Sequence, residues 1–445
     1  MEVRISGIFP NVGKPAFKAG KVELFSDFDN TYCPVAHGQL KNTSPANTPE
    51  MTRYCRDFRG LLGRLKKSLT FHITTGRTFG EYKVVSELIR KRGFELPLPD
   101  TLIVKNGGDE YLRRSSDTEF YRGGRFPFSE NNKNFQKERE IKALTGWDGK
   151  TAKSHLKSLL TDKKFKIVEA DSENCVYDYG EKSLLSKIPD ERKKIFSGSD
   201  KPAWTAGLRN DGYCKIFVTY PPDIESTKER KAAADDIEAK FFGELEKSGV
   251  KYYTYTGRDE NYCYGRPYRV IEPMVDENLT ATETNPRERG LTKLYDTKNA
   301  VERAKKNNDL VLVSGDGAND FNMLNIFRYI DLDEYLPENL KNKNLSPSET
   351  MNVLMKRKDC AEIVRKIREL PITGIVVKNP ESGGALDELT KVFGEYGPFH
   401  KIITVENGEL DKGIKKAVKL YASQNPRFAE KMSPALVSEA GVKKR

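Results

Sequence analysis

The chain has 445 residues, enough for two or three domains, of which 37% are hydrophobic and 32% are charged. This composition supplies apolar cores and a charged surface, so it argues against a disordered chain. No apolar run approaches the roughly 20 residues of a membrane-spanning helix, and the N-terminus lacks the apolar segment of a secretory signal. We therefore expect a soluble cytoplasmic protein without a membrane partner.

Six cysteines and four histidines are scattered along the chain without any Cys-x-x-Cys pair, which argues against a zinc site or a disulfide framework. The net charge of +11 suits an anionic partner, either a small phosphate ester or a nucleic acid. No zinc finger, RNA-recognition motif or basic heptad region is present, so a small phosphorylated substrate is favoured over a nucleic acid.

The N-terminal part alternates short apolar runs with amphipathic segments after an irregular lead-in rich in proline and glycine. We predict strands over 21–26, 69–74 and 101–105, and helices over 49–68 and 79–92. This alternation is typical of a parallel sheet covered on both faces, in which ligands bind beyond the carboxyl ends of the strands. Asp27, Thr75 and Asn106 follow the three strands, so we expect them at one edge.

From about residue 114 the pattern changes to charged segments with short strand-like runs, and alternation resumes with strands over 310–314, 372–377 and 400–405. We therefore predict an α/β fold, with a Rossmann-like core of parallel strands and helices on both faces, and an inserted α+β cap domain. The expected division is a lead-in over 1–20, a core over 21–113 and 271–430, a cap over 114–270, and a basic tail over 431–445.

Two acidic turns follow apolar strands. Asp27 and Asp29 lie two residues apart in DFDNT (27–31), while Asp316 and Asp320 lie in GDGAND (315–320). Carboxylates held so close repel one another unless a cation or a shared proton is present, and Mg²⁺ prefers such oxygen ligands. The DFDNT turn alone is equally well read as a loop that caps nearby amides. For GDGAND the alternative is a glycine-rich turn leading into a helix at Phe321, and it is the weaker reading. Two strand ends with paired acids imply one shared cation.

Two further features suit a phosphate group. TTGR (74–77) places the Thr75 hydroxyl and free backbone amides where a helix begins, although a threonine there usually only caps the helix. Lys293 precedes GDGAND by a short helix and could place an ammonium group beside a phosphate. Lys298, one turn further along, is an equally available candidate for that role.

These motifs resemble, in order, the four motifs of the haloacid dehalogenase (HAD) superfamily: DFDNT, TTGR, a lysine at 293 and GDGAND. The long insertion between the second and third motifs resembles the α/β cap of the Cof-type and sucrose-phosphate-phosphatase branch. IVKNGGDEYL (103–112) and GIVVKNPESGGALDEL (374–389) extend the resemblance through most of the chain. Asn30 stands where glycine is usual, and asparagine tolerates left-handed turn geometry better than most residues.

The resemblance implies a catalytic pair. Asp27 would attack phosphorus and form an aspartyl-phosphate, and Asp29 would protonate the leaving alcohol and then activate water. Mg²⁺ would be bound by Asp27, by Asp29 through its backbone carbonyl, and by Asp316, with Asp320 completing the metal site. Members that cleave carbon–halogen bonds lack the second aspartate, so Asp29 favours phosphate chemistry.

The resemblance also implies that Thr75, Lys293 and Asn319 bind the phosphoryl oxygens. In the cap, Lys215 resembles a lysine-bearing strand of the same branch and could contact substrate, although a solvated surface lysine is at least as good a reading. Trp204 and Arg209 are possible sugar contacts.

The sequence thus predicts a Mg²⁺-dependent phosphatase acting on a phosphate monoester, with sugar phosphates the commonest substrates in this branch. Two alternatives remain open: a phosphomannomutase-like transfer to a sugar, and a non-catalytic module that binds phosphosugars or polyanions. Removal of a 3′-phosphate from nucleic acid would also use the positive charge, and would show strong salt dependence.

Overall fold

The computed structural model describes two sets of residues. The first covers 20–34, 49–77, 79–91, 94–104, 107–114, 126–132, 293–317, 320–330, 333–341, 347–358, 360–378 and 401–442. The second comprises the strands of a smaller sheet between 166 and 274, with a few isolated residues besides. Five predicted features lie outside these residues: most of the lead-in, Asn106, Trp204, Lys215 and Asn319.

An eight-stranded sheet organises the core, in the order β14-β13-β12-β1-β2-β3-β4-β5. Its strands are β1 (Val22–Ser26), β2 (Leu69–Thr74), β3 (Thr101–Val104), β4 (Asp109–Arg113), β5 (Phe128–Glu130), β12 (Leu310–Gly315), β13 (Ile372–Val377) and β14 (Ile402–Val405). The six strands from β14 to β3 are parallel, while β4 and β5 are antiparallel. The predicted α/β class and the parallel character of the core are confirmed.

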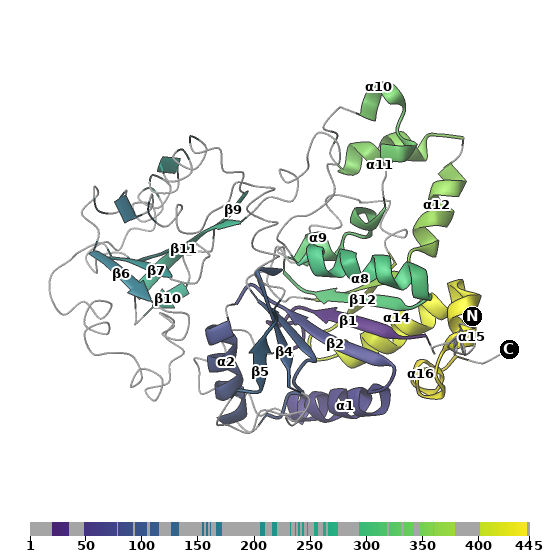
Figure 1. The fold of residues 1–445 in the computed structure, drawn as a ribbon, viewed down its shortest axis with the longest axis horizontal. Helices are drawn as coiled ribbons and strands as arrows, with labels where there is room; N and C mark the ends of the chain where they lie inside the picture. The colour runs from purple at the N-terminus through teal and green to yellow at the C-terminus, as the bar shows by residue number, and fades with distance from the viewer. Residues whose placement is uncertain are drawn as a thin grey trace, which may run out of the picture.

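Helices cover both faces of this sheet (Figure 1). On one face lie α1 (Pro49–Leu65), α2 (Phe79–Lys91) and α14 (Leu410–Gln424), and on the other α8 (Leu294–Asn307), α9 (Phe321–Leu324) and α12 (Cys360–Glu369). Successive side chains of a strand point to opposite faces of the sheet. Leu24 therefore packs in the hydrophobic core under α1, α2 and α14, and Phe25 packs in the core under α8, α9 and α12. The long connection from β12 to β13 also contains η3 (Ile326–Tyr329), η4 (Asp333–Tyr335), α10 (Glu338–Lys341) and α11 (Pro347–Met355).

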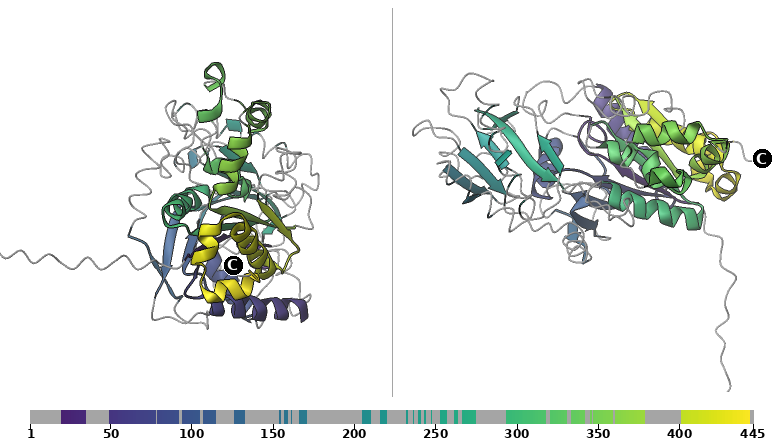
Figure 2. Two further views of the ribbon diagram at one scale, coloured as in Figure 1. Left: turned by 90° about the vertical axis from the view of Figure 1, so that its right-hand side faces the viewer. Right: turned by 90° about the horizontal axis from the view of Figure 1, so that it is seen from above.

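The predicted basic tail over 431–445 is wrong for most of its length. Helices α15 (Pro426–Lys431) and α16 (Pro434–Ala440) close the chain against the core, and Met432 and Leu436 are buried. The helix begins where the Ser433 hydroxyl accepts a hydrogen bond from the Leu436 N–H, with a proline at the first helical position, a common start signal. Figure 2 shows these two helices beside the C-terminus.

The boundary predicted at residue 114 is also wrong, because β5 pairs with β4 and extends the core sheet. Aromatic packing holds this extension: the Phe126 ring packs edge-on against Phe79 and Tyr82. The core therefore continues to at least Asn131, whose N–H donates to Glu110.

Between β5 and α8, where the sequence led us to expect an inserted domain, the chain forms a second sheet (Figure 1). Its strands are β6 (Lys166–Ala170), β7 (Thr205–Arg209), β8 (Ile216–Thr219), β9 (Tyr253–Thr256), β10 (Asn261–Cys263) and β11 (Arg266–Met274). The order is β10-β11-β8-β7-β6, with β9 also on β11, and only β6 and β7 are parallel to each other. Since β11 runs to Met274, the insertion extends beyond the predicted boundary at residue 270. Among the described residues, no helix is long and apolar enough to cross a membrane.

His72 gives the core an acid-sensitive position. Its ring stacks on the ring of Phe25, its partner on the neighbouring strand β1. Burial lowers the pKa of His72 from 6.5 to about 4. Between these two values the unfolded chain binds a proton that the folded chain does not, so stability falls as the pH falls through this window. Lowering the pH from 7 to 5 should therefore decrease the free energy of unfolding of the wild type. In His72→Phe we expect this decrease to be smaller by about 2 kcal/mol, measured by urea denaturation at the two pH values. An equal loss in both proteins would contradict this assignment.

Candidate active site

The loop after β1 carries the first acidic turn and is anchored to the neighbouring strand. The Asp27 N–H donates to the Ser314 carbonyl at 2.8 Å, which joins the ends of β1 and β12. The turn closes when the Cys33 N–H donates to the Phe28 carbonyl at 2.8 Å. Asn30 adopts a left-handed φ of 55°, the conformation that glycine or asparagine adopts most readily. The local backbone thus holds Asp27 at the carboxyl end of β1.

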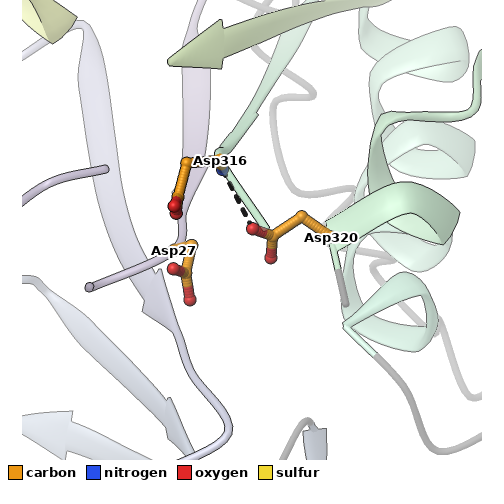
Figure 3. A group of neighbouring side chains, drawn as sticks. All are labelled: Asp27, Asp316 and Asp320. Carbon is orange, nitrogen blue, oxygen red and sulfur yellow. Dashed lines mark hydrogen bonds between the residues drawn. The ribbon is translucent and has the colours of Figure 1, made fainter. Parts of the chain in front are cut away.

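Three carboxylates converge at this edge (Figure 3). Asp27, Asp316 and Asp320 each offer an oxygen within 4.8 Å of the others. All three side chains are buried, with exposed fractions of 6%, 4% and 0%. They come from strand ends nearly 300 residues apart in the chain, and β1 and β12 bring them together because the two strands are parallel neighbours.

Lys293 is the counterion of this cluster. Its side chain is 1% exposed, and its Nζ donates to Asp320 Oδ1 at 2.6 Å and also to Asp27. Lys293 immediately precedes α8, so the start of that helix positions the ammonium group. Of the two lysines left open by the sequence, the structure brings Lys293 into the cluster, whereas Lys298 lies further along α8.

Backbone and hydroxyl donors fix the remaining acids. Asp320 Oδ2 accepts hydrogen bonds from the Asp316 and Gly317 N–H groups, each at 3.0 Å. The Thr31 hydroxyl donates to Asp316 Oδ1 at 2.8 Å, which joins the DFDNT turn to the GDGAND turn. Asp320 therefore orients the loop that presents Asp316.

The electrostatic balance of the cluster is unfavourable without a further cation. Burial raises the pKa of Asp27 well above its ordinary value, and the Asp320 charge raises it further, against the opposing effect of Lys293. Burial and Asp320 likewise raise the pKa of Asp316 to about 7. Burial lowers the pKa of Lys293, but Asp27 and Asp320 raise it by more, so this lysine stays charged. One ammonium cannot balance three buried carboxylates, and a divalent cation with oxygen ligands fits the donor set.

Thr75 and Arg77 follow β2 at the same edge. Because Ser26 pairs with Ile73, the residues after β2 lie beside the DFDNT turn. The Thr75 N–H donates to the Ile103 carbonyl at 2.9 Å, and the Thr75 hydroxyl oxygen accepts from the Arg77 N–H at 3.2 Å. Thr75 is thus buried and rigidly held, with an exposed fraction of 1%.

Arg77 is the residue that the sequence interpretation missed. Its guanidinium forms two hydrogen bonds with the Asp29 carboxylate, at 2.8 Å from Nε to Oδ2 and 2.7 Å from Nη2 to Oδ1. The carboxylate of Asp29 therefore faces Arg77, and only its backbone carbonyl is assigned to a metal by the resemblance. The arginine of TTGR was the available signal, but nothing in the sequence singled it out among the 76 lysines and arginines of the chain.

The parallel sheet and the convergence of Asp27, Asp316 and Asp320 at one edge of it have the arrangement that the sequence motifs predicted. The predicted positions Lys215 and Asn319 lie outside the described residues, as does Trp204, and Arg209 ends β7 of the second sheet.

Comparison with known proteins gave structural matches only. No family model and no curated protein matches the chain. A sucrose-phosphatase from Synechocystis sp. PCC6803, solved with sucrose and phosphate, is 11% identical, covers 90% of this chain and 98% of its own, and has a TM-score of 0.35. A haloacid dehalogenase-like hydrolase from Bacillus subtilis is 15% identical, covers 85% and 93%, and has a TM-score of 0.35. Another from Bacteroides thetaiotaomicron is 12% identical, covers 90% and 98%, and has a TM-score of 0.34. Values this low carry no inference about activity.

Proposed function

We propose that this protein is a haloacid dehalogenase-type phosphatase that hydrolyses a phosphate monoester through an aspartyl-phosphate on Asp27. The observation that carries the proposal is the position of Asp27, buried at the end of β1 between a fully buried lysine and two further carboxylates. Burying each of these charges costs several kcal/mol of desolvation free energy, which the attraction to a bound cation or phosphate would offset. This cost argues against a purely structural cluster.

The proposed reaction has two steps. A carboxylate oxygen of Asp27 attacks phosphorus, the bond from phosphorus to the ester oxygen breaks, and Asp29 gives a proton to that departing oxygen. Water then attacks phosphorus, the bond from Asp27 to phosphorus breaks, and Asp29 takes a proton from the water. Covalent catalysis divides a very slow hydrolysis into two easier displacements.

The charge of the phosphoryl group must be neutralised in both steps. Lys293 would bind a phosphoryl oxygen from its position between Asp27 and Asp320, and Thr75 would donate from the loop after β2. Asp27, Asp316 and the backbone carbonyl of Asp29 would bind Mg²⁺, with Asp320 supporting them. When bound, this ion would supply electrostatic stabilisation of the transferring phosphoryl group.

A sugar phosphate is the substrate class that we propose. The motifs resemble the branch in which a large inserted cap selects the leaving group, and this chain carries a separate sheet between β5 and α8 in the corresponding position. The net charge of +11 favours an anionic substrate.

Phosphate release from sugar phosphates, nucleotides and p-nitrophenyl phosphate tests the proposal. We expect release with Mg²⁺ and at least a 100-fold loss when EDTA replaces it, because the carboxylates then lack their divalent counterion. Calorimetric titration with Mg²⁺ should also give binding that Asp316→Asn weakens. If no compound is hydrolysed but a sugar bisphosphate activates phosphate exchange between sugars, the mutase alternative replaces hydrolysis. Turnover that EDTA does not affect would overturn the metal assignment.

A further inference from the structure

We propose that Arg77 is a positioning residue that holds Asp29 ready to accept a proton from water in the second step. The inference rests on the function proposed above. It starts from the two parallel hydrogen bonds between the Arg77 guanidinium and the Asp29 carboxylate, at 2.8 and 2.7 Å.

The geometry of this pair restrains the Asp29 side chain. A single hydrogen bond would allow the carboxylate to rotate, whereas the planar guanidinium fork fixes both oxygens at once. The Asp29 side chain is 31% exposed and the Arg77 side chain 10%, so the pair lies where substrate and water have access while its cation is largely shielded.

Arg77 is itself anchored through a chain of contacts. Its N–H donates to the Thr75 hydroxyl oxygen, and the Thr75 N–H donates to Ile103 on β3. Asp29 is positioned independently, by its own turn. That turn is formed by the left-handed conformation of Asn30 and by the hydrogen bond from the Cys33 N–H to the Phe28 carbonyl. Two loops, each fixed to a different strand, thus meet in this ion pair, and a displacement of about 1 Å in either would misplace the base.

The chemistry assigns the pair to the hydrolysis step. A base must lie within hydrogen-bond reach of the water whose proton it takes, and the guanidinium fork fixes the direction in which the Asp29 oxygens point. With a good leaving group such as p-nitrophenolate, the first step needs no proton from Asp29. Loss of Arg77 should therefore slow breakdown of the aspartyl-phosphate while leaving its formation from p-nitrophenyl phosphate nearly unchanged.

Rapid-mixing kinetics with p-nitrophenyl phosphate and Mg²⁺ test this assignment. For Arg77→Gln we expect kcat to fall about 10- to 100-fold, with an initial burst approaching about one nitrophenolate per chain. Arg77→Lys, which keeps the charge but not the fork, should fall between this variant and the wild type. In an Asp29→Asn background, Arg77→Gln should have little further effect, because the two residues act as a unit.

Arg90→Gln is the matched control, because Arg90 also contacts a carboxylate through two nitrogens, that of Glu87 within α2. Its kinetics should match the wild type. An Arg77→Gln variant with unchanged kcat would overturn the inference. A variant in which KM rises and the burst slows as much as the steady-state rate would also overturn it, because Arg77 would then bind the phosphate itself. If Asp27→Asn retains activity in the same assay, the proposed function fails, whatever Arg77 does. The Arg77→Lys variant keeps the inference testable if Arg77→Gln folds poorly.

Discussion

Asp27→Asn should lower kcat for phosphate release by about 10³-fold or more, because an amide oxygen is a poor nucleophile for phosphorus and no other carboxylate has the same place at the end of β1. The change preserves the shape of the side chain and removes one of three crowded negative charges, so folding should be retained. Steady-state release from the best substrate and thermal unfolding of the same samples measure the two effects separately.

Asp57→Asn on α1 makes the same chemical change at an exposed position, where Asp57 forms an ion pair with the adjacent exposed Arg56. It should leave kcat within about 2-fold of the wild type. Acid-quenched wild-type protein should carry a phosphoryl group on Asp27 by mass spectrometry, and Asp27→Asn should carry none. A phosphorylated Asp27→Asn protein would place the nucleophile elsewhere.

Gly315→Ala should destabilise the fold by about 1–3 kcal/mol and lower activity at least 10-fold. A Cβ at this position would lie 2.4 Å from both Cβ and Cγ of Asp320, far inside van der Waals contact. Asp320 cannot retreat without losing its hydrogen bonds to the Asp316 and Gly317 N–H groups and its contact with Lys293. The added methyl group therefore acts on the geometry of the site as well as on packing.

Gly63→Ala provides the comparison, because nothing lies within 4 Å of a Cβ at that position in α1. It should stabilise the protein by about 0.5–1 kcal/mol, since alanine has the higher helix propensity. Denaturant unfolding and kcat for both variants test the pair. A Gly315→Ala protein with wild-type stability and activity would show that Asp320 is free to move.

The strands that precede the motifs were the most predictable part of the structure. β2 and β13 have the predicted limits because each is a short apolar run that ends in polar or turn-forming residues. The acidic turns could be placed at one edge for the same reason, since parallel neighbours end on the same side.

Other features depend on contacts that a local pattern does not encode. β5 is only three residues long, and it is a strand because β4 supplies its partner. α16 is a short segment in which only Leu436 and Ala440 are buried, so its basic surroundings concealed its docking on the core. The role of Arg77 depends on its contact with Asp29, which forms where two loops distant in the sequence meet in space.

The core is assembled from two stretches of chain that the inserted sheet separates, and this has a consequence for synthesis on the ribosome. β1 pairs with β12 on one side, and the Thr31–Asp316 hydrogen bond spans 285 residues. Because the ribosome adds about 5–20 residues per second, one side of β1 stays unpaired for a time on the order of tens of seconds until β12 has been synthesised. During that time it is an open edge on which another chain could pair. Lys293, Asp316 and Asp320 are synthesised only at the end of that interval, so a bound cation can stabilise the chain only once β12 is available to pair with β1.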